Sequence, residues 1–510
     1  MIISIFKSML YFFNVSVGYF IRMVIWSSIL GMSIPGIHAQ PSRINIATGS
    51  VVAMKGEGYY QIKEVNGVLR FVDPDGRPFV SVGMYHLNPN LLNYDYNRHV
   101  FMSRYGGSHQ AFIEDSCREL WDWGFNTISM WEGGRLSDGF TPPQCFGTCV
   151  NILPIAYWDT WSGRNPDGLK KLLPEIRSES RHGDGDAVHN NIYYAGFFDV
   201  FSDEWDARCR EKVNAAVSSM SRHRGLMGYY YVDIPIWTPS WWNFRPKVAK
   251  HIKRFDDLFA EGERPSWTDW IRRLDGSSPG KRAFVEHIRG LYADDIAVFN
   301  AVYNTNFLSF DGLLEHTDFS IVRCADPERY KRDDLSFLGL IARRYYETLH
   351  KCVREADPHR LILGDRFDGD AGVPDEVLIE AGKYIDCFSL EYYQFEDMDT
   401  HIEYIKHFHK MTGKPVLLCD SSYSTSTEGL PGNIPPLCEN RQQVGERYIE
   451  YFDRILELPF VVGWHWCGYI DRTAESEGPL QHSGLKDCFG NPYTEAVELI
   501  KAYNERFRVE

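Results

Sequence analysis

Acidic and aromatic side chains recur together along the chain, and each group ends a short apolar run. Asp233, Glu391 and Asp420 each occupy such a position. Two carboxyl groups that face a glycosidic bond from either side can cleave it, one as a proton donor and the other as a nucleophile or base. Aromatic rings suit the apolar faces of sugars. The pattern therefore predicts a carbohydrate site with these three residues as the candidate catalytic groups.

Further residues at or beside the ends of these runs are candidates for substrate binding. They are His86, Trp131, Glu132, Trp158, Asp365, Arg366, Tyr393, Trp464, His465 and Trp466. Some of them also fit a structural role, because histidines and tryptophans often fill a core and Asp365 has an arginine beside it. The spacing of cysteine and histidine does not indicate a zinc site, so we expect neither a metal nor another cofactor.

Eight short apolar runs, separated by helical or loop-like stretches, indicate the elements that must position these residues. Such alternation is typical of a parallel sheet built from βα units, and eight units predict an α/β fold with a (β/α)8 TIM barrel. In barrel enzymes the active site lies at the carboxyl ends of the strands, where the candidate residues are placed. The runs cover residues 79–86, 125–132, 150–156, 226–233, 361–365, 385–391, 415–420 and 461–466.

The regions around these runs suggest the domain organisation. We expect a small β-element over residues 40–77, because alternating residues there are followed by the turn Asp73-Pro74-Asp75-Gly76. The barrel follows over residues 78–510. A long insertion, at about residues 237–350, separates the fourth run from the fifth and contains several helix-like stretches.

The first 39 residues have the features of a cleavable signal peptide. Basic residues flank apolar stretches, and small residues precede a candidate cleavage site after Ala39. Arg22 and Pro35 interrupt the apolar stretch, which is thereby shorter than the roughly 20 residues that span a bilayer. We therefore expect a secreted or periplasmic protein without a membrane span in the mature chain.

Composition excludes some classes of partner. The 510 residues include 54 basic and 69 acidic side chains, which gives a formal net charge of -15. Binding to phosphate backbones needs a basic face, so a nucleic-acid partner is not expected. The aromatic content of 15% is typical of a globular protein with a substantial core. The sequence leaves the oligomeric state open.

From about Gly58 to its carboxyl terminus the chain resembles the clan A glycoside hydrolases, and specifically the β-agarase-like barrels. The similarity rests on the order of several short motifs over some 430 residues. They include residues 71–79 (FVDPDGRPF), 124–127 (GFNT), 198–201 (FDVF) and 463–466 (GWHW). The resemblance implies a hydrolase whose substrate is a polysaccharide or oligosaccharide, with an agar-like galactan as the suggested class.

The chain departs from this family at the catalytic positions. Clan A enzymes carry an Asn-Glu pair after the fourth strand, whose glutamate is the acid/base, and a glutamate nucleophile at the end of the seventh strand. Here Ile234 and Pro235 stand at the first position and Asp420 at the second, whereas Glu391 ends the sixth run.

Three explanations of this departure remain open. The carboxylate pair is relocated, with Asp420 as nucleophile or base and Glu391 or Asp233 as proton donor. Alternatively, the barrel has lost catalysis and binds sugar. The third explanation is metal-assisted hydrolysis on the same frame, in which the ligands would be His86, Asp233, Asp365, Glu391, Asp420 and His465.

Overall fold

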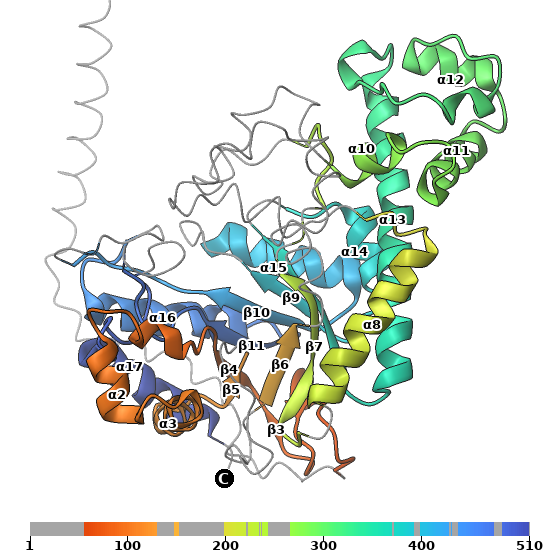
Figure 1. The fold of residues 1–510 in the computed structure, drawn as a ribbon. Coiled ribbons are helices and arrows are strands. Elements are labelled where there is room, and N and C mark those ends of the chain that lie inside the picture. The colour runs from red at the N-terminus through yellow and green to blue at the C-terminus, as the bar shows by residue number, and fades with distance from the viewer. Residues whose placement is uncertain are drawn as a thin grey trace, which may run out of the picture. The chain divides into compact units, whose positions relative to one another are not determined.

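A parallel sheet that curls on itself lies at the centre of the fold in the computed structural model (Figure 1). The described residues are 56–129, 147–151, 198–220, 223–233, 235, 237–242, 266–369, 372–391, 398–427, 430, 437–473 and 482–508. Within these residues, no helix combines the length and the apolar character needed to cross a membrane.

Eight strands make up the curled sheet, and every neighbouring pair is parallel. They are β4 (Ser81–Met84), β5 (Thr127–Ile128), β6 (Gly147–Asn151), β7 (Leu226–Asp233), β8 (Leu361–Asp368), β9 (Phe388–Glu391), β10 (Val416–Ser421) and β11 (Val461–Trp466). They pair in chain order, and β11 pairs with β4 to close the ring.

The predicted α/β class with a curled parallel sheet is confirmed. Each of the eight predicted runs contains or overlaps one strand of the sheet. The third strand begins at Gly147, three residues before the predicted run, and residues 152–156 of that run lie outside the described residues.

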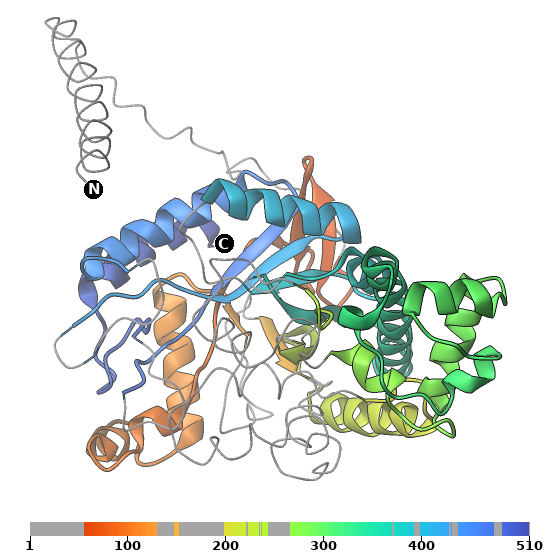
Figure 2. The ribbon, with the colours of Figure 1, turned by 90° about the horizontal axis from the view of Figure 1, so that it is seen from above.

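Helices surround this sheet, as Figure 2 shows. They are α2 (Arg98–Tyr105), α3 (His109–Asp122), α8 (Asp203–Met220), α13 (Pro327–Ala356), α14 (Asp375–Ala381), α15 (Met398–Thr412), α16 (Arg441–Leu456) and α17 (Thr494–Asn504). The buried residues of α16 recur every three or four positions, which gives this helix one apolar face toward the strands. The side chain of Asn440 caps its first turn by accepting a hydrogen bond from the backbone N–H of Gln443.

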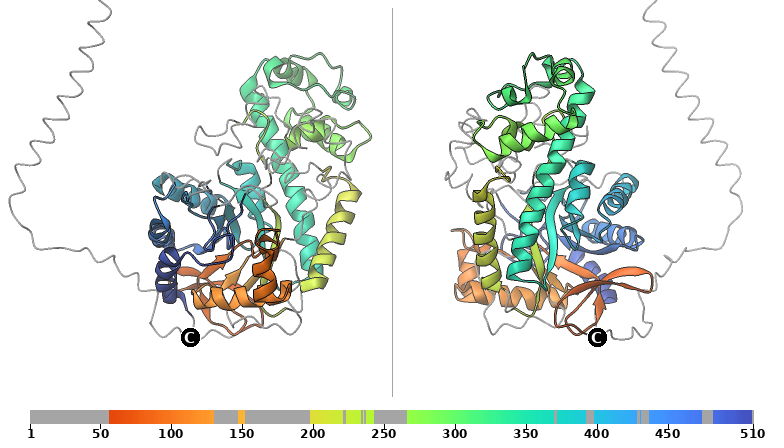
Figure 3. Two further views of the ribbon diagram at one scale, coloured as in Figure 1. Left: turned by 60° about the vertical axis from the view of Figure 1, so that its left-hand side comes forward. Right: turned by 90° about the vertical axis from the view of Figure 1, so that its right-hand side faces the viewer.

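The predicted insertion contains a helical unit of α10 (Trp267–Arg272), α11 (Pro279–Leu291) and α12 (Ile296–Tyr303). Figure 3 shows this unit at one end of the long helix α13, whose other end lies beside α8. Just past the middle of α13, Arg344 binds Asp206 of α8 at 2.9 Å. Helix α13 therefore belongs to the insertion at its start and to the helical layer at its end, and the boundary near residue 350 remains a prediction.

A three-stranded antiparallel sheet precedes the ring and consists of β1 (Gln61–Val65), β2 (Val68–Val72) and β3 (Pro78–Phe79). Asn66 and Gly67 both have positive φ angles, as a tight hairpin turn requires. Aromatic residues of this sheet pack in one core with residues at the amino ends of the barrel strands, among them Leu361 and Leu417. The small sheet therefore lies at the end of the barrel opposite the candidate site.

Candidate active site

Asp420, near the end of β10, is the centre of a polar group at the carboxyl ends of the strands. Its Oδ2 accepts a hydrogen bond from Nη1 of Arg366, in β8, at 2.9 Å. Nε2 of His86, two residues after β4, lies 3.2 Å from Oδ1 and 3.3 Å from Oδ2. Two segments that are distant in sequence thus meet at the carboxylate of Asp420, a residue that is only 4% exposed.

Two members of this group have a strained backbone. Asp420 has a φ of 48° and His86 a φ of 60°, which is the left-handed region that favours glycine. The other described non-glycine residues with positive φ lie in turns and at a helix end: Asn66, Ala293, Asp294 and Asn304. Such strain costs about 1–3 kcal/mol per residue, persists only where surrounding contacts enforce it, and clusters at functional sites.

The charge of Asp420 follows from its neighbours. Burial alone would raise the pKa of this carboxyl group, but His86 and Arg366 outweigh burial and hold the pKa well below its usual value. Arg366 is itself fully buried, and its guanidinium carbon lies 4.9 Å from the ring centre of Tyr85. Asp420 is therefore ionised at neutral pH, which suits a nucleophile or base rather than a proton donor.

A β-bulge in β8 decides which of two adjacent residues joins this group. The pairing with β7 skips Leu363, and Gly364 has a φ of 71°. Arg366 therefore points toward Asp420, whereas Asp365 points toward α13. There Asp365 accepts hydrogen bonds from the hydroxyl groups of Tyr345 and Tyr346, at 3.0 and 2.5 Å.

Asp365 is thus placed away from the polar group at Asp420, although we predicted it as a substrate-binding residue. It is fully buried, and burial raises its pKa to about 7. Its contacts tie the sheet to α13, which is a structural role.

Glu391 is the last residue of β9, is also 4% exposed, and pairs in register with Cys419. Burial raises the pKa of the Cys419 thiol, and the charges of Glu391 and Asp420 raise it further, whereas Arg366 lowers it. Both carboxylates therefore act on the same thiol inside the barrel. This common neighbour places Glu391 in the region of Asp420.

Asp233, the third predicted catalytic residue, ends β7, and its backbone pairs with that of Arg366 in β8. It is therefore at the same end of the barrel as Asp420. Its side chain lies outside the described part of the structure. So do four predicted substrate-binding residues: Trp131, Glu132, Trp158 and Tyr393.

The two tryptophans of β11 point toward the helical layer. Trp464 donates its indole N–H to Oγ of Ser421 at 3.0 Å, and its ring centre lies 4.5 Å from that of Tyr451. Trp466 lies on the same face of the strand, 5.7 Å from Tyr448 of α16. Both are 1% exposed, so they pack beneath the site instead of offering a surface to a sugar.

His465, between these tryptophans, points into the barrel. Its Nε2 lies 2.8 Å from Oγ of Ser81 and its Nδ1 lies 2.9 Å from Oγ of Ser129. Burial lowers its pKa to about 3, so the ring is neutral. A Cβ on Gly83 would come within 2.2 Å of this ring, which explains the glycine in β4. His465 therefore belongs to a buried polar layer of the barrel interior.

Cys467 is a member of the polar group that sequence reasoning missed. It directly follows β11, and its backbone N–H donates to the carbonyl of Ser421 at 3.0 Å. Its sulfur, a ring nitrogen of His86 and a carboxylate oxygen of Asp420 all lie within 4.8 Å of one another. The only available signal was its position at the end of the eighth run.

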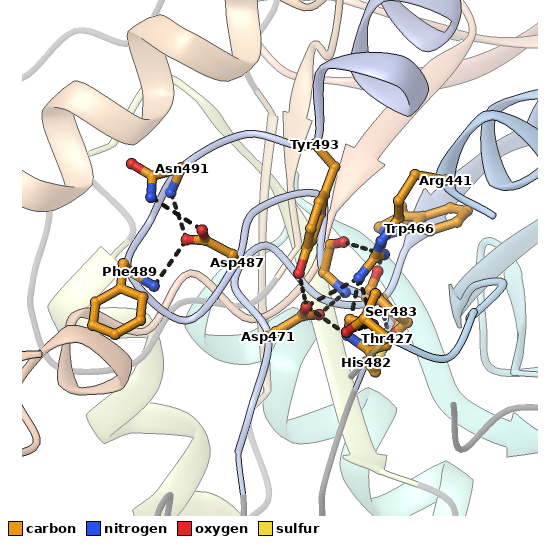
Figure 4. A network of polar contacts seen from close by, with 12 residues as sticks. Thr427, Arg441, Trp466, Asp471, His482, Ser483, Asp487, Phe489, Asn491 and Tyr493 are labelled. Carbon is orange, nitrogen blue, oxygen red and sulfur yellow. Dashed lines mark hydrogen bonds and ion pairs between the residues drawn. The ribbon is translucent and has the colours of Figure 1, made fainter. Parts of the chain in front are cut away.

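A second buried polar network lies beyond β11 and is shown in Figure 4. Oδ2 of Asp471 accepts hydrogen bonds from Arg441 at 3.1 Å, from Nδ1 of His482 at 2.7 Å and from the hydroxyl group of Tyr493 at 2.6 Å. Its Oδ1 accepts a fourth bond, from the backbone N–H of Gly484 at 2.7 Å. These bonds fasten the segment after β11 to the start of α16.

Comparison with known proteins relates this chain to agarases. It is 25% identical over 489 residues to beta-agarase B of Vibrio sp. (strain JT0107), an alignment that covers 89% of this chain and 48% of that protein. A solved exo-beta-agarase structure superposes with a TM-score of 0.67 at 16% identity, covering 92% of this chain and 67% of the other. The agarase AgWH50C gives a TM-score of 0.66 at 16% identity, with coverages of 90% and 67%. No protein-family model matches the chain.

The alignment with beta-agarase B supports the predicted resemblance to agarase-like glycoside hydrolases. The solved structures are similar in fold. The chain spans about half the length of beta-agarase B.

Proposed function

We propose that the protein is a glycoside hydrolase that cleaves an agar-like galactan. The observation that carries the proposal is Asp420, a buried carboxylate that Arg366 and His86 contact at 2.9 and 3.2 Å at the end of the seventh strand of the ring. The similarity to beta-agarase B over 89% of the chain supports the substrate class.

In this proposal Asp420 is the nucleophile or base. His86 and Arg366 hold the pKa of its carboxyl group below the usual value, and Arg366 fixes its orientation through Oδ2. Glu391, at the end of the neighbouring strand β9, is the candidate proton donor, and Asp233 is the second candidate.

The clan, the completeness of the barrel and the export signal are part of the same proposal. We place the chain in clan A and propose that the ring of strands is a complete (β/α)8 barrel. We also propose that residues 1–39 are a cleavable signal for export. Amino-terminal sequencing of the exported protein tests the cut after Ala39.

A screen of the purified protein against polysaccharides and aryl glycosides, with reducing ends measured, tests the activity. We expect reducing ends from agar-like galactans, and Asp420→Asn should lower turnover by at least about 100-fold while sugar affinity changes only a few fold. The amide is almost isosteric with the carboxylate and still bonds hydroxyl groups.

Because Arg366 already occupies one oxygen of Asp420, a barrel that only binds sugar is the second candidate function. Binding without any release of reducing ends would establish that candidate instead.

A further inference from the structure

We propose that His86, Asp420 and Cys467 form a binding site for a divalent cation of the zinc class. The three residues come from the ends of β4, β10 and β11, which are neighbours in the ring. One ring nitrogen, one carboxylate oxygen and one sulfur lie within 4.8 Å of one another. Nitrogen, oxygen and thiolate donors are the set that zinc accepts in proteins.

The spacing of the donor atoms fits tetrahedral coordination. Metal–ligand bonds of about 2.0–2.3 Å place neighbouring ligand atoms about 3.3–3.8 Å apart. Nε2 of His86 and Oδ1 of Asp420 are already 3.2 Å apart. The sulfur of Cys467 lies within 4.8 Å of both of these atoms. A shift of about 1 Å is therefore enough to bring it to the spacing of a third tetrahedral ligand.

The surroundings hold the three ligands in place. Arg366 binds Oδ2 of Asp420 at 2.9 Å and leaves Oδ1 toward His86. Metal-binding carboxylates commonly have such a second partner, which orients them. Cys467 is fixed by its N–H bond to Ser421, and its carbonyl accepts a bond from Oγ of Ser483 at 3.2 Å. The left-handed backbone at His86 and Asp420 directs both side chains to this point.

Charge and access also suit a cation. When the ion binds, the Cys467 thiol releases its proton to solvent, so the thiolate and the Asp420 carboxylate offer two negative charges to the ion, one of which Arg366 shares. The His86 side chain is 15% exposed, which gives the ion a route from solvent. Three protein ligands leave a fourth position for water or a substrate oxygen.

Ion binding has a consequence that rests on the proposed function. The ion takes the carboxylate oxygen of Asp420, and a coordinated carboxylate is a poor nucleophile or base. Zinc should therefore inhibit sugar cleavage reversibly, and a chelator should restore it. Metal binding itself is measured without any sugar, so the two proposals fail independently.

Cobalt and zinc titrations of the full chain, stripped of metal, test the site. We expect one equivalent of Co²⁺ to bind and produce an ultraviolet thiolate-to-cobalt band, and one equivalent of Zn²⁺ to displace it. Cys467→Ser should abolish the band and weaken zinc binding by at least about 100-fold. Cys438→Ser is the matched control, since Cys438 is also buried and lies outside the cluster.

His86→Gln provides a second variant should Cys467→Ser fail to fold, as judged by circular dichroism. It should weaken zinc binding and keep the thiolate band at high cobalt concentration. Stoichiometric binding without a thiolate band, equal zinc affinity in wild type and Cys467→Ser, or no binding at micromolar concentrations would each overturn the proposal.

Discussion

Two buried groups in this molecule combine an aspartate, a histidine and an arginine, and they differ in almost every other respect. Asp420 meets His86 and Arg366 at the carboxyl ends of the barrel strands. Asp471 meets His482 and Arg441 in the segment after β11. The two groups show how the same residue types serve a site in one place and a structural anchor in another.

The two groups differ in their backbone strain and in the number of hydrogen bonds that the aspartate accepts. Asp471 accepts four hydrogen bonds and neither it nor His482 has a positive φ. His482 is fully buried. By contrast, Asp420 and His86 both have a left-handed backbone, and His86 is partly exposed. A closed, unstrained network whose carboxylate accepts four hydrogen bonds stabilises the fold, whereas a strained group that solvent reaches is suited to a ligand.

The largest expected effect is on stability, in the anchor. Asp471→Ala leaves Arg441 buried without its carboxylate and removes four hydrogen bonds, so the free energy of unfolding should fall by about 3–5 kcal/mol. Urea denaturation of wild type and variant measures this loss. A loss below about 1 kcal/mol would mean that the network is not an anchor.

A third buried aspartate, Asp365, differs from both because the side chains that hydrogen-bond to it are the neutral tyrosines Tyr345 and Tyr346. The pKa of Asp365 is raised to about 7, so the folded protein keeps a proton that the unfolded chain loses near pH 4. Its contribution to stability is present below about pH 4 and is lost as the pH rises to about 7. Asp365→Asn does not ionise, so its free energy of unfolding lacks this pH dependence. As the pH rises from about 4 to about 7, the difference between the unfolding free energies of the variant and of wild type should shift in favour of the variant by as much as about 4 kcal/mol.

Denaturation curves at several pH values measure that difference. Parallel pH profiles for wild type and Asp365→Asn would contradict the raised pKa. The variant keeps one acceptor for the tyrosine hydroxyl groups, so the pH dependence is the informative quantity rather than the absolute stability.

The backbone strain at His86 predicts a smaller effect on stability, in which a glycine variant is more stable than an alanine variant. His86→Gly should be more stable than His86→Ala by about 1 kcal/mol, because only glycine adopts a φ of 60° without cost. At His482 the order should reverse, since glycine there only adds flexibility to the unfolded chain. Thermal unfolding of the four variants measures both orders of stability. If the glycine variant were the more stable one at both positions, or the alanine variant at both, the two groups would not differ in backbone strain.

The sequence was sufficient to predict the strands because each is a short apolar run that ends in polar or aromatic residues. All eight runs correspond to strands, and Asp420 and Glu391 end theirs as expected. The apolar pattern that marks a strand lies within a single segment of the chain, so the sequence alone indicates where the strands are.

The orientation of several side chains could not be predicted, because bulges change the alternation of a strand. The pairing of β7 with β8 skips Leu363, which places Arg366 rather than Asp365 beside Asp420. The pairing of β10 with β11 skips Val462, and both tryptophans of β11 consequently face α16. Bulges depend on pairing between strands, and a search for patterns along one segment does not detect them.

The cysteine of the polar group was missed for a related reason. Cys467 is distant from His86 and Asp420 in sequence, and no short spacing motif connects the three. Only closure of the ring, with β10, β11 and β4 side by side, brings them together.

We propose that Asp420 takes part in the reaction and that Asp471 only anchors the fold, and one paired measurement tests this difference. Turnover of an agar-like galactan is measured by reducing ends for Asp420→Asn and Asp471→Asn, each corrected for its folded fraction. We predict that Asp420→Asn loses at least about 100-fold in turnover, whereas Asp471→Asn loses stability and keeps turnover within a few fold per folded molecule. Equal turnover in wild type and folded Asp420→Asn would contradict the account.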